Sequence, residues 1–329
     1  MPALAARSLD ELLAGATSRE PMKTADSKSD AAFERVVIGG EPYVLKHFNE
    51  PDWLADASAD ETVRAVGLWE AGVYELCSDL VDSTVVWAAR LGEPGGWPAA
   101  LLMRDESDAF IPYDATVDLD THDAFMRAMA AIHARFWQEP PAGVVYMDFA
   151  RNFDLLSPGR AVHERDVLGD RSDVLRASLE GWDRFATAYP EVYDAIRALL
   201  HDASPLVDAL DGTPTTFLHG DWKMGNLGRH ADGRVVLVDW DRPAVGPPTF
   251  ELAWYLAVNC DRLPESKEAT IERYRASLES HGIATAGWFD EQLTLTLLGE
   301  LLMLGWSKAD QPEEVGWWAA AAVRALRSL

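Results

Sequence analysis

The first part of the chain alternates short apolar runs with turn signals, a pattern typical of antiparallel strands. Phe33–Ile38 and Pro42–Phe48 flank the pair Gly39-Gly40, which predicts a β-hairpin. Val85–Leu91 and Ala99–Met103 are two more predicted strands, separated by a segment rich in glycine and proline. The pattern therefore predicts a small antiparallel sheet in this part of the chain.

One helix is predicted within the sheet region. Glu61–Leu80 places apolar side chains at helical spacing, and Glu70 falls inside that apolar stripe. A carboxylate on a buried helix face needs a partner. Lys46, the lone lysine of the second predicted strand, is the partner that we expect. Glu61 and Glu75 are the alternative partners for Lys46.

Helical periodicity dominates the rest of the chain. In Asp120–Trp137, apolar side chains recur every three or four residues and share one face. Further helices are predicted over Ser172–Tyr189, Glu191–Leu210, Phe250–Val258, Lys267–His281, Trp288–Ser307 and Glu313–Leu329. The chain therefore divides into a part rich in strands, over residues 1–103, and a helical part over residues 104–329.

Two β-prone runs interrupt the helical part, and an acid follows each of them. Asp221 comes shortly after Thr215–Leu218, and Asp239 comes directly after Val235–Val238. An Asp232-Gly233 turn signal lies between the runs. We therefore expect the two runs to form a hairpin that brings both carboxylates close together at one end.

The polar loop between these runs adds Lys223 and Asn226, and the resulting set of groups suits phosphoryl transfer. Asp221 could accept the proton of a hydroxyl nucleophile. The amide oxygen of Asn226 and the carboxylate of Asp239 are hard ligands of the kind that Mg²⁺ takes. Lys223 lies two residues after the candidate base and would offset charge that develops on the phosphoryl group. Taken singly, Asp221 could be a turn acid and Lys223 a solvated surface lysine.

A metal-dependent hydrolase is the competing interpretation of the same acids. His219 and Asp241 would add two ligands to Asp221 and Asp239. We rank it lower because no second histidine stands at metal-ligand spacing, whereas Asn226 fits a kinase directly. His219 is expected to be structural, and Asp241 to cap or pair locally.

The spacing of His219, Asp221 and Asn226, followed by Asp239, resembles the aminoglycoside phosphotransferase and choline kinase-like family. It is also similar to the protein kinase pattern H-x-D-x-K-x-x-N. The resemblance implies a two-lobed, protein kinase-like α+β fold with a small antiparallel-sheet lobe over residues 1–103 and a larger, mainly helical lobe over residues 104–329. It implies Asp221 as catalytic base, Asn226 and Asp239 as magnesium ligands, and Lys223 at the transferred phosphate.

The same resemblance assigns the nucleotide site. It implies that Lys46 contacts the α- and β-phosphates of ATP and pairs with Glu70. It also implies that Met103 lines the adenine pocket. Backbone groups near Arg104 and Glu106 would then hydrogen-bond the base.

The chain departs from the family in two places. Residues 23–30 hold the position of the phosphate-covering loop but lack its glycines. Glu251 stands where the family usually has an aspartate before Leu-Ala, an acid expected to be structural. The departure at Glu251 leaves the expected chemistry intact but loosens the local match to the family.

The composition of the chain indicates which kinds of molecule it is expected to bind. The 29 Lys and Arg residues against 54 Asp and Glu residues give a formal net charge of −25, which disfavours nucleic acid and is compatible with a cationic substrate. No run approaches the ~18 apolar residues of a membrane span. The two cysteines, Cys77 and Cys260, form no motif, so a cytoplasmic location is expected.

The expected reaction is transfer of the ATP γ-phosphate, with Mg²⁺, to a hydroxyl of a small molecule. Aminoglycosides, amino sugars, sugars and amino alcohols all fit the family. A binding protein that kept the fold without turnover is the second alternative. The retention of Lys46, Asp221, Asn226 and Asp239 argues against it.

Overall fold

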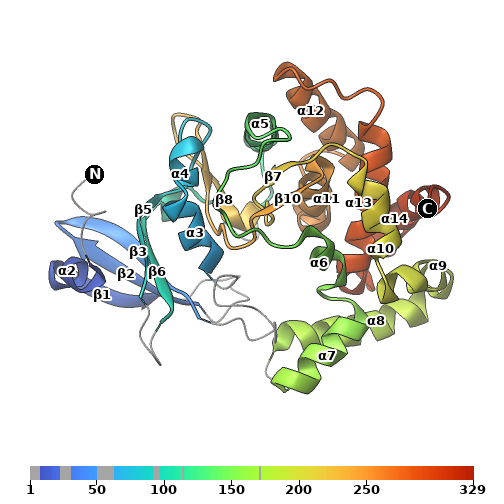
Figure 1. Ribbon diagram of the computed structural model, residues 1–329, viewed down its shortest axis with the longest axis horizontal. Coiled ribbons are helices and arrows are strands. Elements are labelled where there is room, and N and C mark those ends of the chain that lie inside the picture. The colour runs from blue at the N-terminus through green and yellow to red at the C-terminus, as the bar shows by residue number, and fades with distance from the viewer. Residues whose placement is uncertain (1–7, 23–30, 50–62, 92–96, 113–114, 170–171) are drawn as a thin grey trace.

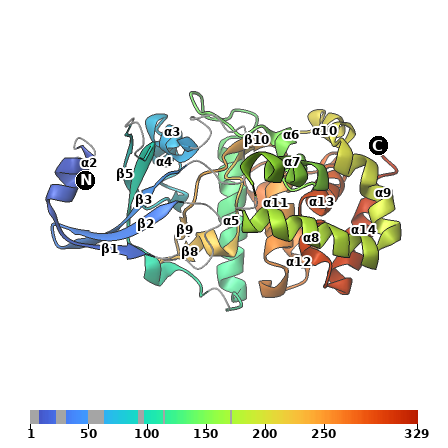
Figure 2. The same cartoon turned by 90° about the horizontal axis from the view of Figure 1, so that it is seen from below.

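The computed structural model describes residues 8–22, 31–49, 63–91, 97–112, 115–169 and 172–329. A five-stranded sheet lies at the N-terminal end and a larger group of helices at the C-terminal end (Figure 1). Seen from below, the two parts follow one another along the long axis, with β8, β9 and α5 between them (Figure 2). The predicted mixed α+β class is therefore confirmed.

The N-terminal sheet has the order β1-β2-β3-β6-β5, and every neighbouring pair is antiparallel. Gly39 and Gly40 both have positive φ, as a two-residue hairpin turn between β2 and β3 requires. The predicted strands are confirmed, whereas β1 was not predicted. The strands are β1 (Ala16–Met22), β2 (Ala32–Ile38), β3 (Glu41–His47), β5 (Val85–Arg90) and β6 (Ala99–Arg104).

Helices cover both faces of this sheet. On one face, Leu12 of α2 (Leu9–Ala14) packs in a small core with side chains of β2, β3 and β6. The other face belongs to the main core of the molecule, which also contains α3 (Arg64–Glu70) and α4 (Val73–Leu76). The single helix predicted over Glu61–Leu80 is wrong, because Gly72 adopts a left-handed φ of 72° and separates α3 from α4.

The small strands of the second half pair differently from the prediction. β8 (Leu227–Arg229) and β9 (Val235–Leu237) form an antiparallel hairpin, and β4 (Val81–Asp82) adds to β9 in parallel. β7 (Thr216–Leu218) instead pairs with β10 (Ala244–Gly246). The predicted hairpin between the two β-prone runs is therefore wrong, because β4 and β8 occupy the two edges of β9.

The helical part matches the predicted periodicity except around residues 149–210. There, α6 and α7 were not predicted, and the expected helix over residues 191–210 is divided into α9 and α10, with Pro205 in the first turn of α10. The helices are α5 (Leu119–Arg135), α6 (Phe149–Asp154), α7 (Pro158–Leu168), α8 (Asp173–Ala188), α9 (Pro190–His201), α10 (Ser204–Asp211), α11 (Pro248–Val258), α12 (Lys267–Ser280), α13 (Phe289–Leu304) and α14 (Pro312–Ala325).

Helix α13 is central to this part of the molecule. It contacts α11, α14 and α6, and nearly all of its side chains are buried. Such a helix is apolar on every side, so a charged residue within it is conspicuous.

In the part of the chain that the structure describes, no helix combines the length and apolar character needed to cross a bilayer.

Candidate active site

Asp221 lies in the loop after β7, and three side chains hold its carboxylate. The amide Nδ2 of Asn226 donates to Oδ2 at 2.9 Å, and the indole Nε1 of Trp254 donates to Oδ1 at 3.1 Å. The ammonium of Lys223 lies 3.1 Å from Oδ2. The structure thus brings Asp221, Lys223 and Asn226 together, as their spacing predicts, and adds Trp254 from α11.

His219 links this loop to the strand that leads to Asp239. Its Nδ1 accepts from the backbone N–H of Asp221 at 3.2 Å, so the proton must be on Nε2, which donates to the carbonyl of Val238 at 3.1 Å. Burial lowers the pKa of His219, although Glu251 and Asp221 oppose that shift. The neutral ring therefore serves as a structural link between the loops that carry the two acids.

Glu251 of α11 also fixes the loop that carries Asp221. One carboxylate oxygen accepts from the N–H of Gly220 at 2.6 Å, and the other from Nε2 of His133 at 2.9 Å. Tyr274 in turn contacts Nδ1 of His133 at 2.6 Å. This acid is 1% exposed and both of its oxygens accept hydrogen bonds from the protein, so its contacts are those of a structural residue.

Gly220 cannot be replaced without moving the loop. Its φ is +83°, and a Cβ atom would lie 1.9 Å from the carbonyl oxygen of Arg242. Gly233 is a matched control, since its φ is +92° but its nearest neighbour is a flexible arginine tip at 3.7 Å. We expect Gly220→Ala to reduce the free energy of unfolding by about 1–3 kcal/mol more than Gly233→Ala, because only the first substitution creates a backbone clash. Urea unfolding of both variants measures this difference, and equal losses would contradict it.

Lys46 meets two acids from the other half of the chain. Its ammonium lies 2.8 Å from Oδ1 of Asp239 and also contacts Asp241. Burial disfavours the Lys46 ammonium, but the two carboxylates outweigh this effect and raise its pKa above the usual range. Lys46 is therefore a permanently charged group at the junction of the sheet and the helical part.

Asp239 itself has an unusual conformation. Its φ of +65° is rare for a residue other than glycine and stores backbone strain. Burial would raise the pKa of Asp239, but the cations of Lys46 and Lys223 hold it well below the usual value. For Asp241, burial and the neighbouring Asp239 raise the pKa, although Lys46 opposes them. Asp239 is accordingly the more firmly ionised acid of the pair.

The predicted Lys46–Glu70 pair is wrong. Glu70 is the last residue of α3, its side chain is 48% exposed, and it pairs with Arg90 of β5 at 3.1 Å. Val66, one turn earlier in α3, is buried, but Glu70 stands at the end of the helix, where its side chain reaches solvent. An exposed pair of this kind contributes about 0–1 kcal/mol. Of the alternative partners, Glu75 is exposed and Glu61 lies outside the described residues.

A family model described as APH, phosphotransferase enzyme family, matches residues 26–288. The chain belongs to this family. It is accordingly an enzyme, a small-molecule phosphotransferase with an alcohol group as the acceptor. No curated protein matches the sequence.

Two solved structures share the fold of this phosphotransferase. Choline kinase LicA from Streptococcus pneumoniae is 16% identical, with a TM-score of 0.51 over 96% of this chain and 95% of that chain. A microcompartment-associated aminopropanol kinase is 15% identical, with a TM-score of 0.58 over 96% of this chain and 94% of that chain. These likenesses confirm the predicted kinase-like fold.

The connection after β6 is the predicted adenine site of the phosphotransferase. Met103 pairs with Val44 in the β3–β6 register and therefore shares the sheet face of Lys46. The N–H of Arg104, however, donates to the carbonyl of Thr84 at 2.9 Å. This N–H is therefore already paired within the protein, and the adenine contacts expected at Met103 and from backbone groups near Arg104 and Glu106 stay predictions.

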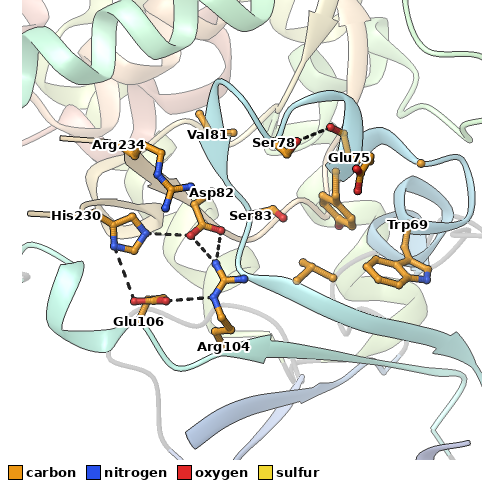
Figure 3. Close-up of a pocket in the computed structure, with 13 residues that line it drawn as sticks. Trp69, Glu75, Ser78, Val81, Asp82, Ser83, Arg104, Glu106, His230 and Arg234 are labelled. Carbon is orange, nitrogen blue, oxygen red and sulfur yellow. Dashed lines mark hydrogen bonds and ion pairs between the residues drawn. The ribbon is translucent and has the colours of Figure 1, made fainter. Parts of the chain in front are cut away.

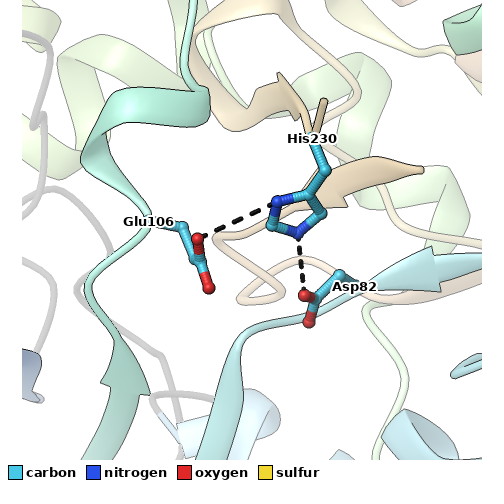
Figure 4. A group of neighbouring side chains, drawn as sticks. All are labelled: Asp82, Glu106 and His230. Carbon is cyan, nitrogen blue, oxygen red and sulfur yellow. Dashed lines mark hydrogen bonds and ion pairs between the residues drawn. The ribbon is translucent and has the colours of Figure 1, made fainter. Parts of the chain in front are cut away.

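The side chains of Arg104 and Glu106 belong to a network that sequence reasoning missed (Figure 3). Arg104 pairs with Asp82 of β4 and, at 3.2 Å, with Glu106. His230, from the β8–β9 turn, lies 3.0 Å from Asp82 (Figure 4). The network borders a pocket of about 550 Å³ that Trp69 and other side chains of α3 and α4 also line.

This network joins the sheet to the β8–β9 hairpin. Three side chains of this network could together bind a metal ion, since their ligand atoms lie close to one another: Asp82, Glu106 and His230. The guanidinium of Arg104 already occupies both oxygens of Asp82, however, and supplies the positive charge there. We therefore interpret the group as an ion-pair network between the two parts of the molecule.

Asn226 and Asp239, the residues expected to hold magnesium, each keep an oxygen that is not used in the bonds described above. The Nδ2 group of Asn226 donates to both the carbonyl and the carboxylate of Asp221, which leaves its Oδ1 as an acceptor facing elsewhere. Only one oxygen of Asp239 is bound by Lys46, and its side chain remains 39% exposed. Two hard oxygen donors are thus available for a divalent cation.

Proposed function

We propose that this phosphotransferase uses ATP and Mg²⁺ and transfers the γ-phosphoryl group to a hydroxyl of a small molecule. The observation that carries the proposal is the fixed carboxylate of Asp221. Asn226 and Trp254 orient it, and the Lys223 ammonium lies beside it. A general base and a cation within 3.1 Å of each other match the needs of phosphoryl transfer from ATP.

Each residue then has a defined task. Asp221 accepts the proton of the acceptor hydroxyl while it orients that hydroxyl toward the phosphoryl group. Lys223 offsets charge on the transferred group, and Lys46 binds the phosphates from the sheet side. Mg²⁺, held by Asn226 and Asp239, would neutralise charge on the phosphate oxygens.

The acceptor is proposed at the level of a class. The two similar structures are named as a choline kinase and an aminopropanol kinase, which supports a small alcohol. A protein substrate fits less well, because only eleven residues separate Asp239 from Glu251 in the sequence. A net charge of −25 is compatible with acceptors that carry an amine but does not select them.

The test is release of ADP from ATP and Mg²⁺ in the presence of a panel of sugars, amino sugars, aminoglycosides and amino alcohols. We expect turnover that depends on both an acceptor and the metal. A metal-dependent hydrolase would instead release phosphate from phosphate esters without ATP. A binding protein would bind nucleotide but form no ADP with any acceptor. Either result would overturn the proposed function.

A further inference from the structure

Helix α11 and its cap hold the catalytic loop, residues 219–226, at three places. The carboxylate of Glu251 accepts from the N–H of Gly220 at 2.6 Å, and the indole N–H of Trp254 donates to Oδ1 of Asp221 at 3.1 Å. The side-chain oxygen of Asn259, the residue that caps the helix, accepts from another backbone N–H of this loop at 2.9 Å. Two of these contacts are with the backbone, and only Trp254 reaches the carboxylate of the expected base.

The indole of Trp254 is itself held in place. Trp254 is 8% exposed, and the guanidinium of Arg242 lies 5.2 Å from the centre of its ring, a favourable cation–π contact. Arg242 is in turn held by Asn152 of α6, whose side-chain oxygen accepts from Nη2 at 2.8 Å. The N–H of Trp254 therefore has a defined position beside Asp221.

The two carboxylate oxygens of Asp221 have unequal surroundings. Oδ2 faces two donors, the amide of Asn226 at 2.9 Å and the ammonium of Lys223 at 3.1 Å. Among the described residues, Oδ1 accepts only from the indole N–H of Trp254. Because each carboxylate oxygen can accept about two hydrogen bonds, Oδ1 keeps one acceptor position and Oδ2 keeps none.

We propose that Trp254 is a positioning residue that fixes Oδ1 of Asp221 as the oxygen that accepts the proton of the acceptor hydroxyl. This inference rests on the proposed function, because it needs a hydroxyl that is phosphorylated. In the reaction, the O–H bond of this hydroxyl breaks and its proton passes to Oδ1. The hydroxyl oxygen bonds to the γ-phosphorus, and the bond from this phosphorus to the bridging oxygen breaks to release ADP.

A donor on Oδ1 matters because the last side-chain torsion of an aspartate has a broad range. Asn226 donates to one carboxylate oxygen only, so it restrains the rotation of this group less than donors on both oxygens do. With Trp254 on the other oxygen, the plane of the carboxylate is fixed, and Oδ1 presents its remaining acceptor position in one direction. A misplacement of about 1 Å can cost about 10²-fold in rate.

The test is a pair of substitutions that separate the N–H of Trp254 from the bulk of its ring. Trp254→Phe keeps a six-membered aromatic ring but has no N–H. Trp254→His loses more bulk, but Nε2 of histidine lies at the same ring position as Nε1 of tryptophan and can donate. Trp182→Phe is the matched control, since Trp182 of α8 is also buried and donates its N–H to the carbonyl of Leu156 at 2.8 Å.

We expect Trp254→Phe to lower kcat about 10–100-fold and to leave KM for ATP nearly unchanged, because it disturbs the base and no nucleotide contact. Trp254→His should keep more of kcat than Trp254→Phe, although it should lower Tm further because it removes more buried surface. Trp182→Phe should keep the kcat of the wild type. In an Asp221→Asn background, Trp254→Phe should cost little more, because both changes act through one carboxylate.

Two results would overturn the inference. If Trp254 contributes packing alone, Trp254→Phe will have a kcat closer to that of the wild type than Trp254→His has. If Trp254 acts elsewhere, Trp254→Phe will lower kcat by the same factor with Asp221 and with Asn at this position. The second comparison needs only Trp254→Phe, so it decides the question even when Trp254→His does not fold.

Both of these results leave the proposed function intact, because the wild type still transfers phosphate to its acceptor. Failure of the wild type to release ADP with every acceptor would instead contradict the proposed function. It would also remove the hydroxyl proton that Oδ1 is proposed to accept, and the inference would fall with it.

Discussion

Replacing Asp221 by asparagine should lower kcat by about 10²–10⁴-fold while ATP still binds, because the change removes a general base. The geometry adds a second cause. Asp221 accepts hydrogen bonds from Trp254 and Asn226 and lies beside the Lys223 ammonium, so all three neighbours present donors. The NH2 group of an asparagine at this position would face the N–H donor of at least one of these three neighbours, and two donors cannot form a hydrogen bond. ADP release with the best acceptor measures the loss.

The control for this change is Asp232→Asn. Asp232 is an acid in the β8–β9 turn, its side chain is 61% exposed, and it pairs with Arg234 at the surface. We expect this variant to keep wild-type turnover, since it lies outside the catalytic loop. Thermal unfolding establishes that both variants are folded. A folded Asp221→Asn enzyme with near-wild-type kcat would show that another group accepts the proton.

Local spacing along the chain was sufficient to predict that three residues of the candidate site lie together. Asp221, Lys223 and Asn226 lie within one loop, so their contacts depend on few long-range choices. The α+β class followed from periodicity, since strands and helices of the two parts differ in period and length. The family followed from the order of these residues and Asp239 along the sequence.

Contacts between distant segments could not be predicted in the same way. The partners of Lys46 are Asp239 and Asp241, which lie 193 and 195 residues later in the chain. The break between α3 and α4 did have a visible signal in Gly72, because a glycine within a helical pattern weakens that assignment. The pairing of β7 with β10 rather than β9 depends on β4, a strand from more than 130 residues earlier in the chain.

The acid within α13 shows the same limit. Glu300 is visible in the sequence as one acid within a run of leucines, which signals a buried carboxyl group but names no neighbour. Its neighbours depend on how α13 packs against α11, α14 and α6. The network of Asp82, Arg104 and His230 likewise joins three separate segments.

Replacing Asp239 by asparagine should abolish most of the effect of magnesium on nucleotide binding. Asp239 is the more firmly ionised of the two acids at Lys46, and one of its oxygens is left for a cation. An amide in its place is neutral, and it also deprives Lys46 of an ionic partner. Calorimetric titration of ATP, with magnesium and with a chelator, measures the difference in affinity for the wild type and the variant.

Asp241→Asn is the matched comparison, because Asp241 shares the Lys46 ammonium with Asp239 and differs in position by only two residues. If Asp239 holds the metal and Asp241 serves mainly to pair with Lys46, Asp241→Asn should change ATP affinity with and without magnesium by similar factors. The magnesium effect itself should then survive in Asp241→Asn and be lost in Asp239→Asn. The reverse outcome would move the metal to Asp241. It would also leave the strained φ of +65° at Asp239 without the ligand role that we assign to it.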